Sequence, residues 1–224
     1  MRHDFDDDDQ NSGPRGLERI LFCFAVDQEA RYVTRPGMEI LVTGMGRENA
    51  ERAVHAVLKR EPPQLVLTCG FAGGLNPYLK SGTVVFSADD DAGLTPLLLD
   101  AGACPVNFHC ADRVAVTVGE KQQLWTQTGA DAVEMESGII RAICRAHGIP
   151  SGTVRAISDS ASENLPLDFN AMMTADARIS YLKVIRSLIA APGRIGGLIR
   201  LQRQCQLAAK NLAAVLLRVI PGPE

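Results

Sequence analysis

The chain has 224 residues, 46% of them apolar, and a formal net charge of −3. This length and composition suit one large domain with a buried core and exclude a disordered chain. No apolar run reaches the 18 residues of a transmembrane helix, and no apolar signal segment follows Met1. Six cysteines without a Cys-x-x-Cys pair give no indication of zinc, so we expect a reduced, cytoplasmic protein without a metal site.

The first part of the chain alternates apolar runs with loops. Residues 1–18 hold five Asp in their first nine positions and are predicted to be a disordered acidic tail. Apolar runs of strand length follow at residues 20–26, 38–43 and 65–69. The first leads into Asp27-Gln28-Glu29-Ala30, where a helix can begin with acidic residues in its first turn.

Glycine-rich loops end the second and third of these runs. Gly44-Met45-Gly46-Arg47 precedes a predicted helix, so its N–H groups suit an anion, although a plain tight turn explains the same residues equally well. Gly70-Phe71-Ala72-Gly73-Gly74-Leu75 suits a turn that brings backbone close to a ligand.

The middle of the chain is less regular. Residues 83–86 and 114–118 are predicted strands, and residues 87–112 a surface excursion bordering the site. Asp89-Asp90-Asp91 lies in that excursion, and a solvated loop is favoured over a metal site there.

Residues 130–159 read as a strand–helix–strand unit, with Glu134 and Glu136 after the first strand and Asp159 after the second. A helix is expected from Asp168 to about residue 190, and another over residues 197–219. We therefore predict a single-domain, three-layer α/β/α protein with a central mixed, mostly parallel sheet and a C-terminal helical extension. The expected division is a tail at 1–18, the domain at 19–190 and a basic amphipathic helix at 191–224.

The carboxylates follow strand ends, where open α/β sheets place their ligands. Paired carboxylates at such a site favour glycosidic chemistry. An oxocarbenium-like transition state needs an acid at the leaving group, and a carboxylate can also accept both hydroxyl protons of a ribose. The plainer alternative makes Glu136 and Asp159 helix caps or first-turn residues. Among the four histidines only His109 falls in a predicted loop, which argues against Ser/His/Asp catalysis.

Several motifs in order resemble the nucleoside phosphorylase and nucleosidase family. They are Ala25-Val26-Asp27-Gln28-Glu29, the turn Gly70 to Leu75, Ser81-Gly82-Thr83-Val84-Val85, Val133-Glu134-Met135-Glu136-Ser137 and Arg155-Ala156-Ile157-Ser158-Asp159. The resemblance covers roughly residues 19–190 and implies cleavage of the N-ribosyl bond of a purine nucleoside.

The resemblance also implies roles for individual residues. Asp159 would be the general acid that protonates the purine at N7, and its acid form would have to persist near neutral pH. Glu29 would position an attacking water. Glu136 would hold the ribose hydroxyls and Met135 would pack under the sugar. The remaining site residues it implies are Glu134, Phe71, Gly70 and Arg155, the last orienting the carboxylates.

Phosphorolytic members hold phosphate with an Arg and a Ser around the glycine turn, where this chain has Thr68 and Phe71. The remaining candidates for a phosphate site are therefore Gly44, Gly46, Arg47 and Thr68, with phosphate as a possible co-substrate and no other cofactor expected. The base-stacking aromatic is open, with Phe108 and Trp125 as candidates.

The C-terminal part resembles hopanoid-associated phosphorylases, on Leu182 to Leu188, Ala191-Pro192-Gly193 and Leu198 to Leu201. Residues 178–220 contain eight Lys or Arg and no acid, which fits either an anionic membrane surface or pairing with the protein's own acidic body. An adenosylhopane-type phosphorylase is therefore the first hypothesis. A methylthioadenosine/S-adenosylhomocysteine nucleosidase is the second, and a non-catalytic nucleoside-binding or membrane-associated module the third. We expect a homo-oligomer and, given the negative charge, no nucleic-acid partner.

Overall fold

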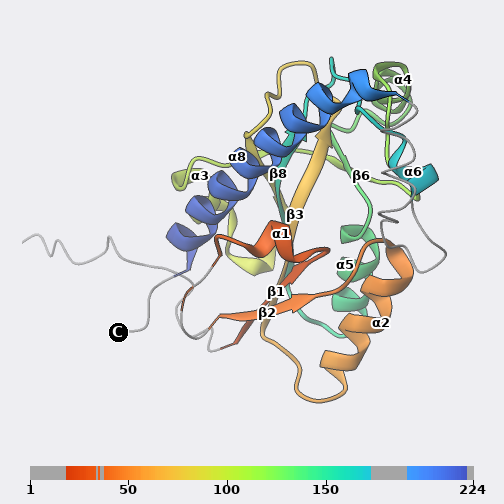
Figure 1. Cartoon of the computed structure of the whole chain (residues 1–224). Helices are drawn as coiled ribbons and strands as arrows, with labels where there is room; N and C mark the ends of the chain where they lie inside the picture. Colours follow the sequence, from red (N-terminus) through yellow and green to blue (C-terminus); the bar gives the residue numbers. More distant parts are fainter. Residues whose placement is uncertain (1–18, 34, 36–37, 173–190, 221–224) are drawn as a thin grey trace, which may run out of the picture.

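A computed structural model describes residues 19–33, 35, 38–172 and 191–220 (Figure 1). The predicted acidic tail, and most of the helix predicted from Asp168 to residue 190, lie outside the described residues.

Parallel strands dominate the sheet that organises the structure. Its main path runs β2 (Glu39–Val42), β1 (Ile20–Phe24), β3 (Leu65–Gly74), β8 (Ser151–Asp159), β4 (Val84–Ala88) and β5 (Cys104–Pro105). Short strands β6 (Phe108–Cys110) and β7 (Ala132–Glu134) join through the far end of β3. Among the strands of the described residues, only the β4–β8 and β3–β7 pairs are antiparallel, so the prediction of a mixed, mostly parallel sheet is confirmed.

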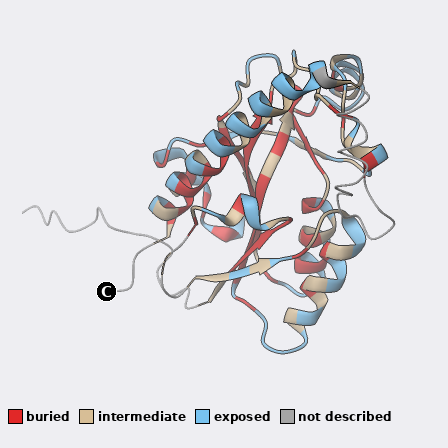
Figure 2. Ribbon diagram, viewed as in Figure 1, coloured by how far each residue is buried: buried red, intermediate tan, exposed pale blue. Residues whose placement is uncertain are grey.

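Helices cover both faces of this sheet (Figure 1). On one face, α2 (Arg47–Leu58) and α5 (Ser137–Ala146) pack against Leu21 and Cys23 of β1. On the other, α8 (Ile195–Val219) packs with Phe22 and Phe24 of the same strand. Alternate residues of β1 thus enter opposite cores, as the two-residue repeat of a strand requires, and the three-layer arrangement is confirmed. Figure 2 shows the buried residues gathered on the strands and on the sheet-facing sides of the helices.

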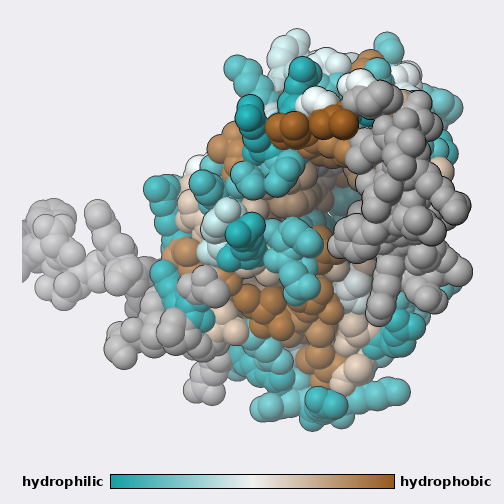
Figure 3. All heavy atoms as spheres, in the orientation of Figure 1, coloured by the Kyte–Doolittle hydropathy of each residue, from teal (hydrophilic) through white to brown (hydrophobic). Residues whose placement is uncertain are grey.

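The C-terminal helix belongs to the main core. Ala208, Leu212, Ala213, Val215, Leu216 and Val219 of α8 are buried in the same cluster as the strands. Its outer side exposes Ile195, Ile199 and Leu207, and the edge strand β2 exposes Ile40 and Val42. Figure 3 shows apolar atoms over both places. Among the described residues we find no helix both long enough and apolar enough to cross a membrane.

The strand predicted at residues 114–118 is wrong. Val116 and Thr117 donate their N–H groups to the Glu120 carboxylate, and the Thr117 hydroxyl accepts from Glu120 N, so this segment is the capped start of α4 (Val118–Thr128). Its backbone bonds to Leu165 and Asn170 instead of a strand.

The predicted surface excursion at residues 87–112 is more ordered than expected. It contains η1 (Asp90–Ala92), α3 (Thr95–Asp100), β5 and β6, and buries Leu94 and Leu98. Asp89 accepts hydrogen bonds from Ser151 and pairs with Arg141 (2.5 Å). It therefore ties this excursion to the sheet. The remaining short elements are α1 (Asp27–Ala30), α6 (Phe169–Met172) and η2 (Pro192–Arg194).

Candidate active site

A cavity of about 340 Å³ lies at the carboxyl ends of β1, β3 and β8, beside β7. Four acidic residues border it: Glu29, Glu134, Glu136 and Asp159. Parallel strands converge at this edge, so residues separated by 130 positions in the sequence come together here. The cavity volume lies at the lower end of the range that small-molecule sites occupy.

Arg155 supplies the positive charge behind these carboxylates. It lies in the middle of β8 and is only 1% exposed. One guanidinium nitrogen lies 2.7 Å from Glu134 Oε2 and 3.6 Å from Glu136 Oε2, and the other donates to the Cys69 carbonyl (3.1 Å). The orienting role of Arg155 stays a prediction, and the guanidinium lies close to two of the carboxylates that it would orient.

Gly70 makes room for this arrangement. Its φ of +146° is one that residues with a side chain rarely adopt. A Cβ there would lie 2.5 Å from Arg155 Nη1 and 2.6 Å from Glu29 Oε1. The glycine is thus required because a cation and a carboxylate occupy the space a side chain would fill.

Glu29 is held entirely by backbone donors. Its Oε1 accepts from Phe71 N (2.8 Å), and its Oε2 from Ala25 N (3.0 Å) and Val26 N (3.3 Å). Burial raises the pKa of Glu29 to about 7, although Arg155 and the N–H donors act in the opposite direction. A carboxyl group with this pKa can exchange a proton near neutral pH, as a general base must.

Glu134 and Glu136 differ in whether a carboxylate oxygen remains free to bind a ligand. Glu134 accepts from Glu136 N, from Ser137 N and hydroxyl, and from Arg155. Burial acts to raise the pKa of Glu134, but Arg155 and these donors outweigh it and hold the pKa below its usual range. With its bonds used inside the protein, Glu134 anchors the start of α5 and does not offer a free oxygen to a ligand.

Glu136 keeps one oxygen for a ligand. Its Oε1 accepts from Gly46 N (2.9 Å), while Oε2 stands 3.6 Å from Arg155. Burial raises the pKa of Glu136, against the effect of Arg155. Met135 borders the cavity beside it. These positions suit the sugar-binding roles that the resemblance implies.

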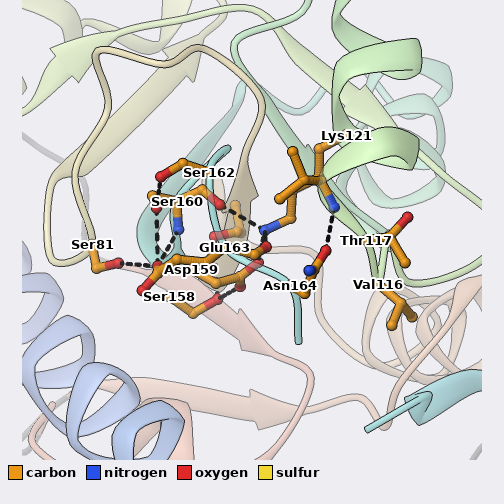
Figure 4. A network of polar contacts seen from close by, with 12 residues as sticks. Ser81, Val116, Thr117, Lys121, Ser158, Asp159, Ser160, Ser162, Glu163 and Asn164 are labelled. Atoms are coloured by element: carbon orange, nitrogen blue, oxygen red, sulfur yellow. Dashed lines mark hydrogen bonds and ion pairs between the residues drawn. The ribbon is translucent and has the colours of Figure 1, made fainter. Parts of the chain in front are cut away.

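Asp159 carries a contact that sequence reasoning missed. Its Oδ1 accepts from the Ser158 hydroxyl (2.6 Å), and its Oδ2 from the ammonium of Lys121 (2.5 Å) (Figure 4). Lys121 lies on α4, in the stretch whose beginning was predicted as a strand. Because its partner lies 38 residues later, no local pattern could reveal the pair.

The candidate phosphate residues do not assemble around the cavity. Thr68 is fully buried in β3, and its hydroxyl lies 3.4 Å from the hydroxyl of Thr153 on the neighbouring strand β8. It does not line the cavity. Arg47 is exposed at the start of α2 and also lies outside the lining, as does Gly44. Gly46 reaches the site only by donating its N–H to Glu136.

The aromatic residues at the cavity are Phe71 and Phe169. Phe108 packs partly buried against Ala72 and its neighbours, and Trp125 is 38% exposed on α4. Phe108 and Trp125 are not among the residues that line the cavity. His109 lies on β6 and does not line it either.

Sequence comparison identifies the class of protein to which this sheet and its carboxylate site belong. A family model described as the phosphorylase superfamily matches residues 30–109 and 106–221, and the chain belongs to that family. The expected class, an enzyme of the nucleoside phosphorylase and nucleosidase type, is confirmed. At the level of the family, so is cleavage of the N-ribosyl bond of a nucleoside.

Solved structures of this type share the fold. The 5′-methylthioadenosine/S-adenosylhomocysteine nucleosidase of Neisseria meningitidis, in complex with methylthio-immucillin-A, is 20% identical with a TM-score of 0.65, over 91% of this chain and 98% of that one. S-adenosylhomocysteine nucleosidase from Streptococcus pyogenes is 16% identical, with a TM-score of 0.66 over 92% and 98%. Futalosine hydrolase of Helicobacter pylori is 17% identical, with a TM-score of 0.61 over 89% and 97%.

Replacing Arg155 should destabilise the protein strongly and in a pH-dependent way. Arg155→Met leaves Glu29, Glu134 and Glu136 without their buried counter-charge, a loss of about 3–5 kcal/mol in the free energy of unfolding at pH 8. At pH 5 the loss should be smaller, because the raised pKa values of Glu29 and Glu136 let both take up protons. Denaturant unfolding at the two pH values measures this.

The matched control is Arg145→Met, at the exposed end of α5. It should change stability by no more than about 0.5 kcal/mol at either pH. An equal loss from Arg155→Met at pH 5 and pH 8 would contradict the electrostatic account.

Proposed function

We propose that this protein hydrolyses the N-ribosyl bond of an adenine nucleoside. The observation that carries the proposal is the position of Glu29. Its carboxylate accepts the N–H groups of Ala25, Val26 and Phe71, which are the backbone donors that an anion at this loop would need. The protein's own carboxylate thus sits where phosphate would bind, and the nucleophile that fits beside it is water.

The other phosphate candidates support hydrolysis in the same way. The N–H of Gly46 is committed to Glu136, Thr68 lies inside the sheet, and the Phe71 side chain has no polar atom. Phosphorolysis, the first hypothesis from the sequence, would need these contacts to be broken. We therefore place the hydrolytic alternative ahead of it.

The chemistry follows from the four positions. Glu29 takes a proton from water as the water oxygen bonds to the ribose C1′. The C1′–N9 bond breaks, its electron pair passes to the base, and N7 of the base receives a proton through Asp159. Glu136 accepts the ribose hydroxyls, and Met135 packs against the sugar.

Adenine as the base is proposed from the resemblance and from the nucleosidases with the same fold, two of which carry adenosylhomocysteine in their names. Phe71 and Phe169 border the cavity and offer apolar surface to a purine ring. A futalosine hydrolase has a similar fold, so the fold alone leaves open which nucleoside is the substrate.

A lipid-linked adenine nucleoside is the substrate we propose within this class, and α8 is the reason. Leu201 and Cys205 of this helix line the cavity, while its outer side combines the exposed Ile195 and Ile199 with basic residues such as Arg203. A helix of this kind can rest on an anionic bilayer and leave the cavity beside the lipid. A homo-oligomer is proposed from the resemblance alone.

The test of the reaction is adenine release from methylthioadenosine, adenosylhomocysteine and adenosine, each with and without phosphate. We expect phosphate-independent release, and a loss of kcat of about 10²-fold or more in Glu29→Gln. Glu48→Gln, on the exposed first turn of α2, is the control and should be unaffected. Release that occurs only with phosphate would refute hydrolysis.

The pH dependence of kcat/KM provides a second prediction. Because the pKa of Glu29 is raised to about 7, its base form is present above that pH and is lost below it. Initial rates between pH 5.5 and 8.5 should therefore show kcat/KM rising through about pH 7. A profile that stays flat from pH 5.5 to 8 would exclude Glu29 as the base.

Membrane contact is tested with vesicles. The full chain should co-sediment with phosphatidylglycerol vesicles at low salt and less at high salt. Arg203→Glu should weaken binding by about fivefold or more, since each basic residue contributes on the order of 1 kcal/mol. Arg145→Glu, at the end of α5 on the opposite face of the sheet, is the matched charge reversal. Equal sedimentation of both variants with wild type would remove the proposal.

A further inference from the structure

Lys121 is a buried ammonium group that the reaction described above does not use. It lies on α4, one turn after the capping residue Thr117, and its side chain has no exposed surface. A charge without access to water is costly to bury unless it is paired and hydrogen-bonded. The burial of Lys121 therefore depends on the specific contacts that its ammonium group makes.

All three N–H groups of Lys121 have acceptors. They reach Asp159 Oδ2 (2.5 Å), the Ser160 carbonyl (2.7 Å) and the Glu163 carbonyl (2.9 Å) (Figure 4). Two of these acceptors are neutral backbone groups on the loop after β8. The third is the carboxyl group proposed to protonate the base.

These contacts create a conflict with the acid role of Asp159. Its Oδ2 accepts from the ammonium of Lys121 (2.5 Å), and an ammonium group at this distance stabilises the carboxylate form. Its Oδ1 lies 2.6 Å from the Ser158 hydroxyl, which also lies 3.3 Å from the Ala72 carbonyl. A carboxylate has no proton to give. Of the two groups beside it, the ammonium of Lys121 is a far stronger acid than the Ser158 hydroxyl and can supply the proton.

We propose that Lys121 is a positioning residue that acts through Asp159, holding its carboxylate in place and supplying the proton that Asp159 passes to the leaving base. This inference rests on the proposed function, because it assigns the source of the proton in that reaction. Lys121 itself does not touch the substrate.

The number of N–H groups on Lys121 fits the proposed proton transfer. When one proton moves from Nζ to Asp159 Oδ2, the neutral amine keeps two N–H groups, which is the number needed for Ser160 O and Glu163 O. Asp159 then gives its proton to N7 as the C1′–N9 bond breaks, and is a carboxylate again. After base release Asp159, which the solvent can reach, takes up a proton and returns it to the amine of Lys121, which has no exposed surface. Glu29 releases the proton that it took from water.

A second cavity provides the place for that exchange. It has a volume of about 310 Å³ and borders Asp159, Ser162, Glu163, Asn164 and Arg200. It shares Asp159 with the substrate cavity, so the acid is reached from two spaces. One suits the nucleoside and the other, with its polar residues, suits water.

Glu163 fixes the loop that receives Lys121. Its carboxylate accepts from Ser160 N (2.9 Å), from the Ser81 hydroxyl (3.4 Å) and from Gln204 of α8 (2.9 Å). The two carbonyl acceptors of Lys121 are thus held in place by contacts to the turn before β4 and to the C-terminal helix. A purely structural Lys121 would serve only this loop.

The experiment separates the two roles by a double-mutant cycle and a pH series. Wild type, Lys121→Met, Asp159→Asn and the double variant are assayed for adenine release from methylthioadenosine between pH 5 and 8. Each single change should lower kcat at pH 8 by about 10²-fold or more, and the double variant should be no worse than Asp159→Asn within about threefold. The double variant removes both charges and so leaves neither buried alone, which keeps the cycle interpretable if Lys121→Met folds poorly.

The decisive readout is the ratio of kcat in Lys121→Met to kcat in wild type. Without Lys121, Asp159 must take its proton from solvent, so this ratio should rise as pH falls. Of the other titratable groups near the pair, Glu29 affects both proteins equally and cancels. Hydrogen bonds hold the pKa of Glu163 below its usual range against the effect of burial, and burial raises the pKa of the Cys205 thiol to about 11, so neither titrates in this interval.

Three results would overturn the inference. A ratio that does not change with pH would make Lys121 structural, as would losses that multiply in the double variant. Full activity in Lys121→Met would show that Asp159 obtains its proton without it. A wild-type protein that releases base from no nucleoside would instead refute the proposed function, and the inference with it.

Discussion

The placement of one buried guanidinium among three carboxylates is the constraint on which the site depends. Arg155 lies in β8, near the middle of the sheet. Glu29 approaches it from α1, and Glu134 and Glu136 approach it from the end of β7 and the turn that follows. Burial alone would lower the pKa of Arg155, but these carboxylates raise it, so its charge is secure. The positive charge of Arg155 offsets the repulsion between the carboxylates, so they can lie close together. Gly70 follows from the same constraint, since a Cβ at that position would displace both Arg155 and Glu29.

The three carboxylates share one cation but not one function. Glu134 accepts hydrogen bonds from the first turn of α5, and Glu136 accepts one from Gly46. Glu29 accepts three N–H groups, two from the loop after β1 and one from β3. Burial acts to raise the pKa of all three carboxyl groups. For Glu134 the charge of Arg155 and the hydrogen bonds outweigh burial and lower the pKa, whereas the pKa values of Glu29 and Glu136 remain raised. Environment thus divides residues of one chemical type into an anchor, the proposed base and the proposed sugar ligand.

The parts of this site that could be predicted are those that short sequence patterns encode. Apolar runs located β1, β3 and β8, and the acidic residues after them fell at one edge because parallel strands share their direction. The segment before α4 was predicted wrongly, because an alternating apolar run is equally compatible with a strand and with the approach to a helix cap. Thr68 was misplaced for a related reason: its position near the glycine turn says nothing about which face of the strand it occupies. Lys121 could not be found, since only the folded chain brings α4 to the end of β8.

The same contacts explain why the C-terminal helix belongs to the chemistry as well as to the core. Gln204 of α8 binds Glu163, Glu163 fixes the Ser160 loop, and that loop holds two of the three hydrogen bonds of Lys121. Leu201 and Cys205, on either side of Gln204, line the substrate cavity. A shift of α8 along the sheet would therefore alter the shape of the cavity and the position of the acid together. If the outer side of this helix rests on a lipid surface, as we propose, the surface that delivers the substrate also contacts the element that helps to hold Asp159 in place.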